Sequence, residues 1–132
     1  MLLLTGAAGF IGFHMARRLL AAGHEIVGVD DLNPYYDPAL KRARLAQLKS
    51  ARFHFVECDI AAAGALEAAA PAREVTHILH LAAQAGVRYS LEAPFAYEHS
   101  NLAGHLAVLE HARAAPRLAH LVYASSSSVY GD

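Results

Sequence analysis

Short apolar runs alternate with amphipathic stretches along the whole chain. The apolar runs predict strands near residues 1–5, 24–30, 52–57, 75–82 and 118–125. The stretches between them have apolar residues at helical spacing and predict helices near residues 10–22, 38–49, 61–70 and 94–114. Strands that alternate with helices form a parallel sheet, because each helix is the crossover between two strands. We therefore expect an α/β fold, a doubly wound parallel sheet of about five strands in the order 3-2-1-4-5.

Helical spacing also predicts which faces of the helices are buried. In the first helix the predicted buried face carries Ile11, Met15, Leu19 and Ala22. In the long helix near 94–114, the same spacing predicts that the core receives Leu102, Leu106 and Leu109.

Composition and charge narrow the class of protein. The chain has 132 residues, of which 55% are hydrophobic and 17% charged, enough for one domain with a real core. The net charge is −1 and no basic stripe is present, so we expect neither a nucleic-acid partner nor an anionic membrane. No apolar stretch reaches the roughly 18 residues that a membrane span needs.

The single cysteine, Cys58, excludes an internal disulfide and fits a reducing cytoplasm. The nine histidines form no compact ligand set, so no metal site is expected.

The turn after the first strand has the spacing of a phosphate-binding loop. Gly6 permits a sharp turn, Gly9 lets an anion approach the backbone, and Gly12 lets the following helix pack against the sheet. The first N–H groups of that helix would face the anion. The pattern predicts a dinucleotide pyrophosphate site, although a plain strand–helix turn that needs small residues would look the same.

Two acidic residues end the next two strands. Asp30 lies about 20 residues past the glycines, where a carboxylate binds the adenosine ribose and repels a 2′-phosphate. This position favours NAD over NADP, although Asp30 could instead cap the next turn. Asp59 could accept from the adenine amino group, cap a helix near Ala61, or do both. Arg42 and Arg44 are expected on a solvated face.

Small residues and serines follow the last two strands. Leu81-Ala82-Ala83 leaves room for a ligand at the carboxyl end of the fourth strand. After the fifth strand, Ser125-Ser126-Ser127-Ser128 supplies hydroxyl groups at the same end of the sheet. A serine-rich loop without a function is the alternative.

These motifs occur in an order that resembles a known family. The order of these motifs resembles that of the extended short-chain dehydrogenase/reductases. The matching motifs are the glycine turn, Asp30, Cys58-Asp59-Ile60, His80-Leu81-Ala82-Ala83 and the segment 125–131. That family includes the NAD-dependent nucleotide-sugar epimerases and dehydratases, which have a Rossmann domain. Residues 30–41 and 84–90 further resemble the UDP-glucuronate 4-epimerases.

The resemblance implies a role for each matching residue. The implied cofactor-binding residues are Gly6, Gly9, Phe10, Ile11, Gly12, Asp30, Asp59, Ile60, Leu81, Ala82, Ala83 and Asn101. Ser126 matches the catalytic hydroxyl that hydrogen-bonds the reacting sugar hydroxyl, while Arg88 and Ser127 are implied to bind substrate. The family also implies a UDP-sugar substrate and a homodimer that uses the long helix.

One departure from the family pattern affects the expected activity. No tyrosine in this sequence has a lysine four residues later, as the family's Tyr-x-x-x-Lys base requires. We therefore expect residues 1–132 to be an incomplete, truncated NAD-binding domain that lacks the substrate domain and is inactive alone. A stand-alone NAD-binding module without catalysis stays possible. A 4,6-dehydratase is less favoured, because Ser127-Ser128 stand where that enzyme has an Asp-Glu pair.

Overall fold

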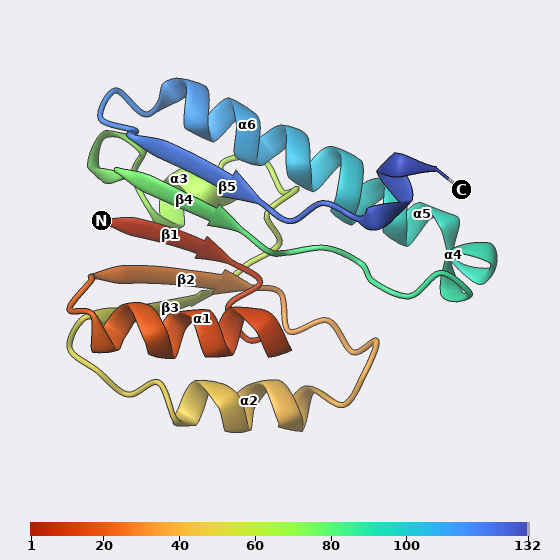
Figure 1. The fold of residues 1–132 in the computed structure, drawn as a ribbon, viewed down its shortest axis with the longest axis horizontal. Coiled ribbons are helices and arrows are strands. Elements are labelled where there is room, and N and C mark those ends of the chain that lie inside the picture. Colours follow the sequence, from red (N-terminus) through yellow and green to blue (C-terminus); the bar gives the residue numbers. More distant parts are fainter. Residues whose placement is uncertain (132) are drawn as a thin grey trace.

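The computed structural model describes residues 1–131, and within them five strands form one parallel sheet. The strands are β1 (Leu2–Thr5), β2 (Ile26–Asp30), β3 (Phe53–Glu57), β4 (His77–His80) and β5 (His120–Tyr123). Their order is β3-β2-β1-β4-β5, and every neighbouring pair is parallel, as the sequence predicts. The carboxyl ends of the strands consequently lie at one end of the molecule, where the connecting loops gather (Figure 1).

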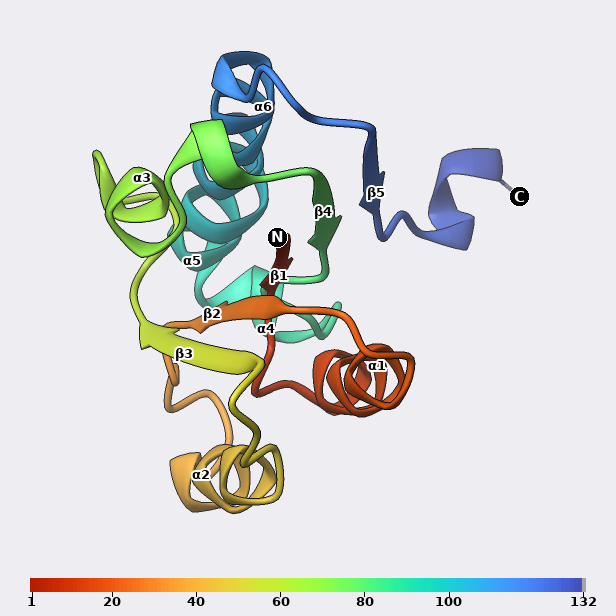
Figure 2. The same cartoon turned by 90° about the vertical axis from the view of Figure 1, so that its left-hand side faces the viewer.

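Helices cover both faces of the sheet. Figure 2 shows α1 (Phe10–Ala21) and α2 (Pro38–Ala46) on one face, and α3 (Ala65–Ala69) and α6 (Gly104–Ala114) on the other. The remaining short helices are α4 (Tyr89–Glu92), α5 (Pro94–Tyr97), the π-helical turn η2 (Glu98–Ala103), and the 3₁₀ turns η1 (Ala72–Glu74) and η3 (Ser127–Tyr130). No helix within residues 1–131 is both long and apolar enough to cross a bilayer.

Alternating strand residues build two cores, one on each face. Leu4 and Ile26 pack with Phe13 and Ala16 of α1, whereas their strand neighbours Leu3 and Val27 join the opposite core. That opposite core also includes residues Leu66 and Val108 of α3 and α6. Because both faces are covered, nearly every residue of the central strands is buried, which explains their continuous apolar runs.

The predicted buried face of α1 is confirmed in part, because Leu19 packs against the core and Met15 is half-buried, but it is wrong at both ends of the helix. Ile11 is 62% exposed and Ala22 is exposed, whereas Gly12, Phe13 and Ala16 are buried. A Cβ on Gly12 would overlap the carbonyl oxygen of Gly6, so only a glycine allows this close approach of helix and turn. The contact turns Gly12 inward and therefore turns Ile11 toward solvent.

The long helix near 94–114 is divided by the π turn η2, and its predicted core face is wrong. Leu102, Leu106 and Leu109 are 67%, 60% and 40% exposed. Gly104, Val108 and His111 are buried instead. A π turn accommodates an extra residue, so it shifts the residues that follow it around the helix axis. The homodimer expected to use this helix stays a prediction.

Candidate functional site

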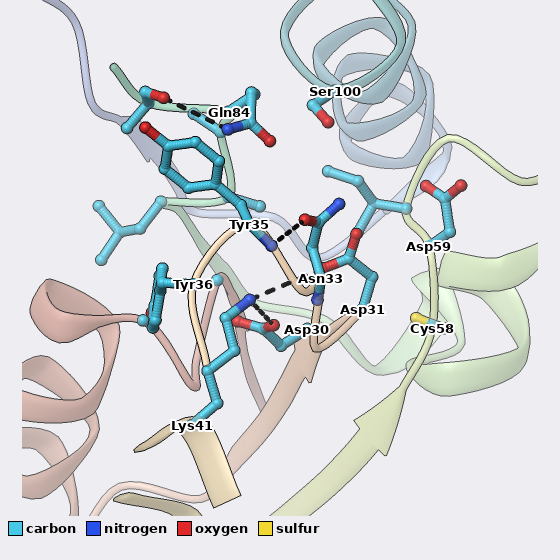
Figure 3. Close-up of a pocket in the computed structure, with 17 residues that line it drawn as sticks. Asp30, Asp31, Asn33, Tyr35, Tyr36, Lys41, Cys58, Asp59, Gln84 and Ser100 are labelled. Carbon is cyan, nitrogen blue, oxygen red and sulfur yellow. Dashed lines mark hydrogen bonds and ion pairs between the residues drawn. The ribbon is translucent and has the colours of Figure 1, made fainter. Parts of the chain in front are cut away.

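A cleft lies beyond the carboxyl ends of β1 to β4 (Figure 3). Its lining comes from the glycine turn, from the segments after β2, β3 and β4, and from the π turn η2. The structure brings together in this cleft eight of the predicted cofactor residues, namely Gly6, Gly9, Asp30, Asp59, Ile60, Leu81, Ala82 and Ala83.

The glycine turn forms a cradle that side chains would fill. Gly6 has φ of 69°, and a Cβ there would lie 2.8 Å from the backbone nitrogen of Ala82. Gly9 donates its N–H to the Gly6 oxygen over 3.0 Å and leads directly into α1. The first N–H groups of a helix have no partner within it, so those of Phe10 and Ile11 suit an anion. The geometry therefore fits a diphosphate.

Asp30 is a buried carboxylate that ties together three segments. Its Oδ2 accepts from the N–H of Ala8 over 3.1 Å. Its Oδ1 accepts from the N–H of Leu32 and from the ammonium of Lys41, both over 2.9 Å. The turn-capping role considered from the sequence is thus present. A carboxylate has about four acceptor positions, so these three bonds leave one unused on a residue that lines the cleft.

Arg44 lies against the glycine turn, and the prediction of a solvated face is wrong for this residue. Its Nη1 donates to the Ala8 oxygen over 3.2 Å and to the Tyr36 hydroxyl over 3.0 Å. Its guanidinium also stands 5.9 Å from the ring centre of Phe10. Arg42 is exposed, as predicted.

Asp59 ends the β3 segment and is held at both carboxylate oxygens. Oδ1 accepts from the N–H of Ala61 over 2.9 Å, and Oδ2 lies 2.6 Å from Nε2 of His99. Burial would raise the pKa of Asp59, but the hydrogen bonds from His99 and Ala61 outweigh it and lower the pKa. Helix α3 begins only at Ala65, so Asp59 closes the turn before the helix.

Asn101 supports the cleft from behind its lining. Its Oδ1 accepts from the N–H of Gln84 over 2.8 Å, and its Nδ2 donates to the Gln84 oxygen over 3.1 Å. These two bonds join η2 to the segment that follows β4, so Asn101 fixes the loop that Gln84 contributes to the cleft.

The hydroxyl of Thr5 joins the ends of β1 and β4. Its oxygen accepts from the N–H groups of Leu81 and Ala82, each over 3.1 Å. With both lone pairs used, the hydroxyl proton points to Nδ1 of His80, 2.7 Å away. His80 is therefore neutral with its proton on Nε2. Burial and repulsion from His105 agree, because they lower the pKa of His80 to about 4.

The neutral state of His80 predicts a loss of stability in acid. Unfolded histidine titrates near pH 6.5, so as the pH falls below this value the unfolded chain binds the proton first. The contribution of His80 is complete above about pH 6.5 and is lost as the pH falls toward 4. Denaturant unfolding at pH 7 and pH 4.5 should show wild type losing about 2 kcal/mol more than His80→Asn. Equal losses in both proteins would contradict the assignment.

The lining of the cleft does not include seven of the predicted site residues: the cofactor residues Phe10, Ile11, Gly12 and Asn101, and the substrate-side and catalytic residues Arg88, Ser126 and Ser127. Arg88 is exposed just before α4, and Ser126 and Ser127 are exposed beyond β5. The backbone oxygen of Ser126 accepts from Val129 over 3.2 Å. The substrate and catalytic roles implied for Arg88, Ser126 and Ser127 stay predictions.

Sequence comparison decides the family. A model of the NAD dependent epimerase/dehydratase family matches residues 2–132. The chain belongs to this family. Over 129 residues it is 49% identical to UDP-glucuronate 4-epimerase 3 of Arabidopsis thaliana, covering 98% of the chain and 30% of that protein. It is also 53% identical over 131 residues to a probable UDP-glucuronate 4-epimerase of Rhizobium meliloti, covering 98% of the chain and 38% of that protein.

Solved structures of family members share the fold. A mutant UDP-glucuronic acid 4-epimerase of Bacillus cereus, in complex with UDP-4-deoxy-4-fluoro-glucuronic acid and NAD, is 33% identical with a TM-score of 0.88. The match covers 99% of this chain and 41% of that one. A dTDP-glucose 4,6-dehydratase of Streptomyces venezuelae with bound NAD is 34% identical, with a TM-score of 0.86, covering 100% and 41%. The chain therefore corresponds to the amino-terminal, NAD-binding region of these epimerases and spans well under half the length of its relatives.

Several polar residues in this family member's site were missed by sequence reasoning. Lys41 is buried against Asp30, and His99 contacts Asp59. Tyr35 and Gln84 also line the cleft. Lys41, Tyr35 and Gln84 fall within the segments that resemble UDP-glucuronate 4-epimerases, and that resemblance could have indicated that they belong to the site. His99 lies in neither segment, and no pattern in the sequence indicates its partner.

Proposed function

We propose that this chain is the NAD-binding part of a nucleotide-sugar 4-epimerase that acts on UDP-glucuronate or UDP-galacturonate. The observation that supports it most is the single cleft in which the glycine cradle, Asp30 and Asp59 meet. Relatives named as UDP-glucuronate 4-epimerases, at about half of positions identical, support the substrate class.

Each part of the cleft fits a part of the dinucleotide. The glycine turn and the first N–H groups of α1 would hold the pyrophosphate. The free acceptor position of Asp30 would take a ribose hydroxyl, and Asp59 with Ile60 would contact adenine. The segment Leu81-Ala82-Ala83 would lie along the nicotinamide half. The donor and acceptor groups present therefore fit NAD.

Inversion at C4 of the sugar needs oxidation of the C4 alcohol to a ketone, followed by reduction on the opposite face. NAD, when bound, supplies the hydride acceptor and donor for this pair of steps. Ser126 would hydrogen-bond the reacting hydroxyl, with Arg88 and Ser127 on the substrate side. Because no tyrosine of residues 1–132 has a lysine four positions later, we expect no turnover from this chain alone.

A second candidate is a NAD-binding module without catalysis, which needs no Tyr-x-x-x-Lys pair, and residues 1–132 contain none. The coding sequence after residue 132 separates the two. A Tyr-x-x-x-Lys motif there, and UDP-glucuronate epimerisation by the longer product, would support the enzyme. A stop codon directly after Asp132, or a longer product that binds NAD without epimerising UDP-glucuronate, would contradict it.

Removal of the Asp30 carboxylate should abolish discrimination between NAD and NADP. In the wild-type chain we expect NAD to bind about tenfold more tightly than NADP, since the carboxylate repels a 2′-phosphate. In Asp30→Ala the ammonium of Lys41, now without its 2.9 Å partner, would attract that phosphate. Titration of both cofactors measures the ratio, and Glu25→Gln, which removes an exposed carboxylate before β2 and outside the cleft, is the control that should retain the preference. Unchanged selectivity in Asp30→Ala would contradict the ribose assignment.

A further inference from the structure

Asp59, the carboxylate assigned to adenine, is hydrogen-bonded to His99 of the π turn η2. We propose that His99 is a positioning residue for Asp59 and makes NAD binding depend on pH, with the tightest binding while His99 is protonated. This inference rests on the proposed function, because it assigns a control of the same cofactor site.

The two contacts of Asp59 fix the plane of its carboxylate. The Ala61 N–H holds Oδ1 at 2.9 Å, and Nε2 of His99 holds Oδ2 at 2.6 Å. The Asp59 side chain is 44% exposed, so without His99 its Oδ2 would face water and could rotate. A short contact to a charged imidazole is among the stronger hydrogen bonds of a protein. His99 thus holds the acceptor in one orientation.

His99 reaches Asp59 from a rigid part of the fold. Asn101, two residues further along η2, is bonded to both backbone groups of Gln84. Gly104 follows η2 and packs so closely on Ile60 that a Cβ would lie 3.1 Å from its Cδ1 atom. The π turn is therefore anchored on the segments after both β3 and β4, which sets the position of His99.

The contact leaves room for adenine. A carboxylate has about four acceptor positions, and Ala61 and His99 occupy two. An adenine amino group can donate to a third without displacing the imidazole. His99 would therefore orient the acceptor and would not compete with the cofactor. A hypoxanthine base, which has a carbonyl oxygen in place of the amino group, would meet the carboxylate oxygen without a proton between them.

The charges around His99 set the direction of the pH dependence. The hydrogen bond and charge of Asp59, and the charges of Glu98 on η2 and Asp31 after β2, raise the pKa of His99 above its usual value. The pKa of Asp59 is lowered, so Asp59 stays ionised over the range in which His99 titrates. The charged pair is complete below about pH 6.5 and is lost as the pH rises through the higher pKa of His99. NAD affinity should fall over the same interval.

Titration of NAD into the 132-residue chain from pH 6 to pH 9 tests the inference. We expect the Kd of the wild type to rise about fivefold across this range. His99→Gln should bind with the weaker affinity at every pH. The matched control is His24→Gln, because His24 is exposed before β2, at the opposite end of the sheet, and this variant should follow the wild-type profile.

Nicotinamide hypoxanthine dinucleotide locates the effect at the base. At pH 6 the wild type should prefer NAD over this analogue, and the preference should fall in His99→Gln but not in His24→Gln. If His99→Gln kept the wild-type pH profile or the wild-type preference, or bound NAD more tightly, the inference would be overturned while the proposed function stood. Absence of NAD binding by the wild type at every pH would overturn both.

Discussion

Replacement of Gly6 by alanine is expected to abolish NAD binding and to lower the free energy of unfolding by about 3 kcal/mol. The new Cβ would lie 2.8 Å from the backbone nitrogen of Ala82 and 2.8 Å from the carbonyl carbon of Leu81. Neither backbone atom can move without shifting the end of β4 from β1. The φ of 69° adds the strain of a left-handed conformation. Denaturant unfolding and NAD titration measure the two losses.

Gly64→Ala is the matched control for this prediction. Gly64 has φ of 75°, close to that of Gly6, but a Cβ there would meet nothing within 4 Å. This variant should lose only the backbone strain, about 1 kcal/mol, and should keep NAD binding. If Gly6→Ala and Gly64→Ala lost similar amounts of unfolding free energy and NAD affinity, backbone strain would account for the effect. The prediction that Gly6 is required by its close approach to the end of β4 would then be contradicted.

Truncation of Lys41 is expected to destabilise the chain by about 3–5 kcal/mol. The ammonium lies 2.9 Å from Asp30, and the two side chains are only 9% and 5% exposed. Lys41→Ala would leave the Asp30 carboxylate buried without its counter-charge. The loss should also weaken NAD binding, because Asp30 lines the cleft. Unfolding free energy and NAD affinity are the measurements.

Two further variants isolate the charge of Lys41. Lys49→Ala removes an exposed lysine and should change stability by less than about 0.5 kcal/mol. The double variant Asp30→Asn/Lys41→Met removes both charges and should recover part of the stability lost in Lys41→Ala. If Lys41→Ala unfolded like Lys49→Ala, the buried ion pair would contribute nothing measurable.

The sequence predicted the sheet well because strand alternation and apolar runs are local signals. Continuous apolar segments identified the strands, and the glycine turn identified where the first helix begins. Helix faces were predicted less well, since they depend on contacts between elements. Ile11 is exposed because Gly12 approaches Gly6. Leu102 is exposed on a π turn that no spacing rule revealed.

The sequence could predict those site residues that stand at the end of a strand. Asp30 and Asp59 end parallel strands, and parallel strands bring such ends together, so their arrival in one cleft was foreseeable. Lys41 and His99 come from helices whose rotation decides whether they reach those carboxylates. That rotation depends on tertiary packing, and no single sequence pattern contains it.

Calorimetric titration of NAD into the purified 132-residue chain at pH 7 tests the dinucleotide site most directly. We expect saturable binding of one NAD per chain, weaker binding of NADP, and loss of the signal in Gly6→Ala but not in Gly64→Ala. A chain that is folded by circular dichroism yet shows no saturable binding of NAD would contradict the central claim that this cleft is a dinucleotide site.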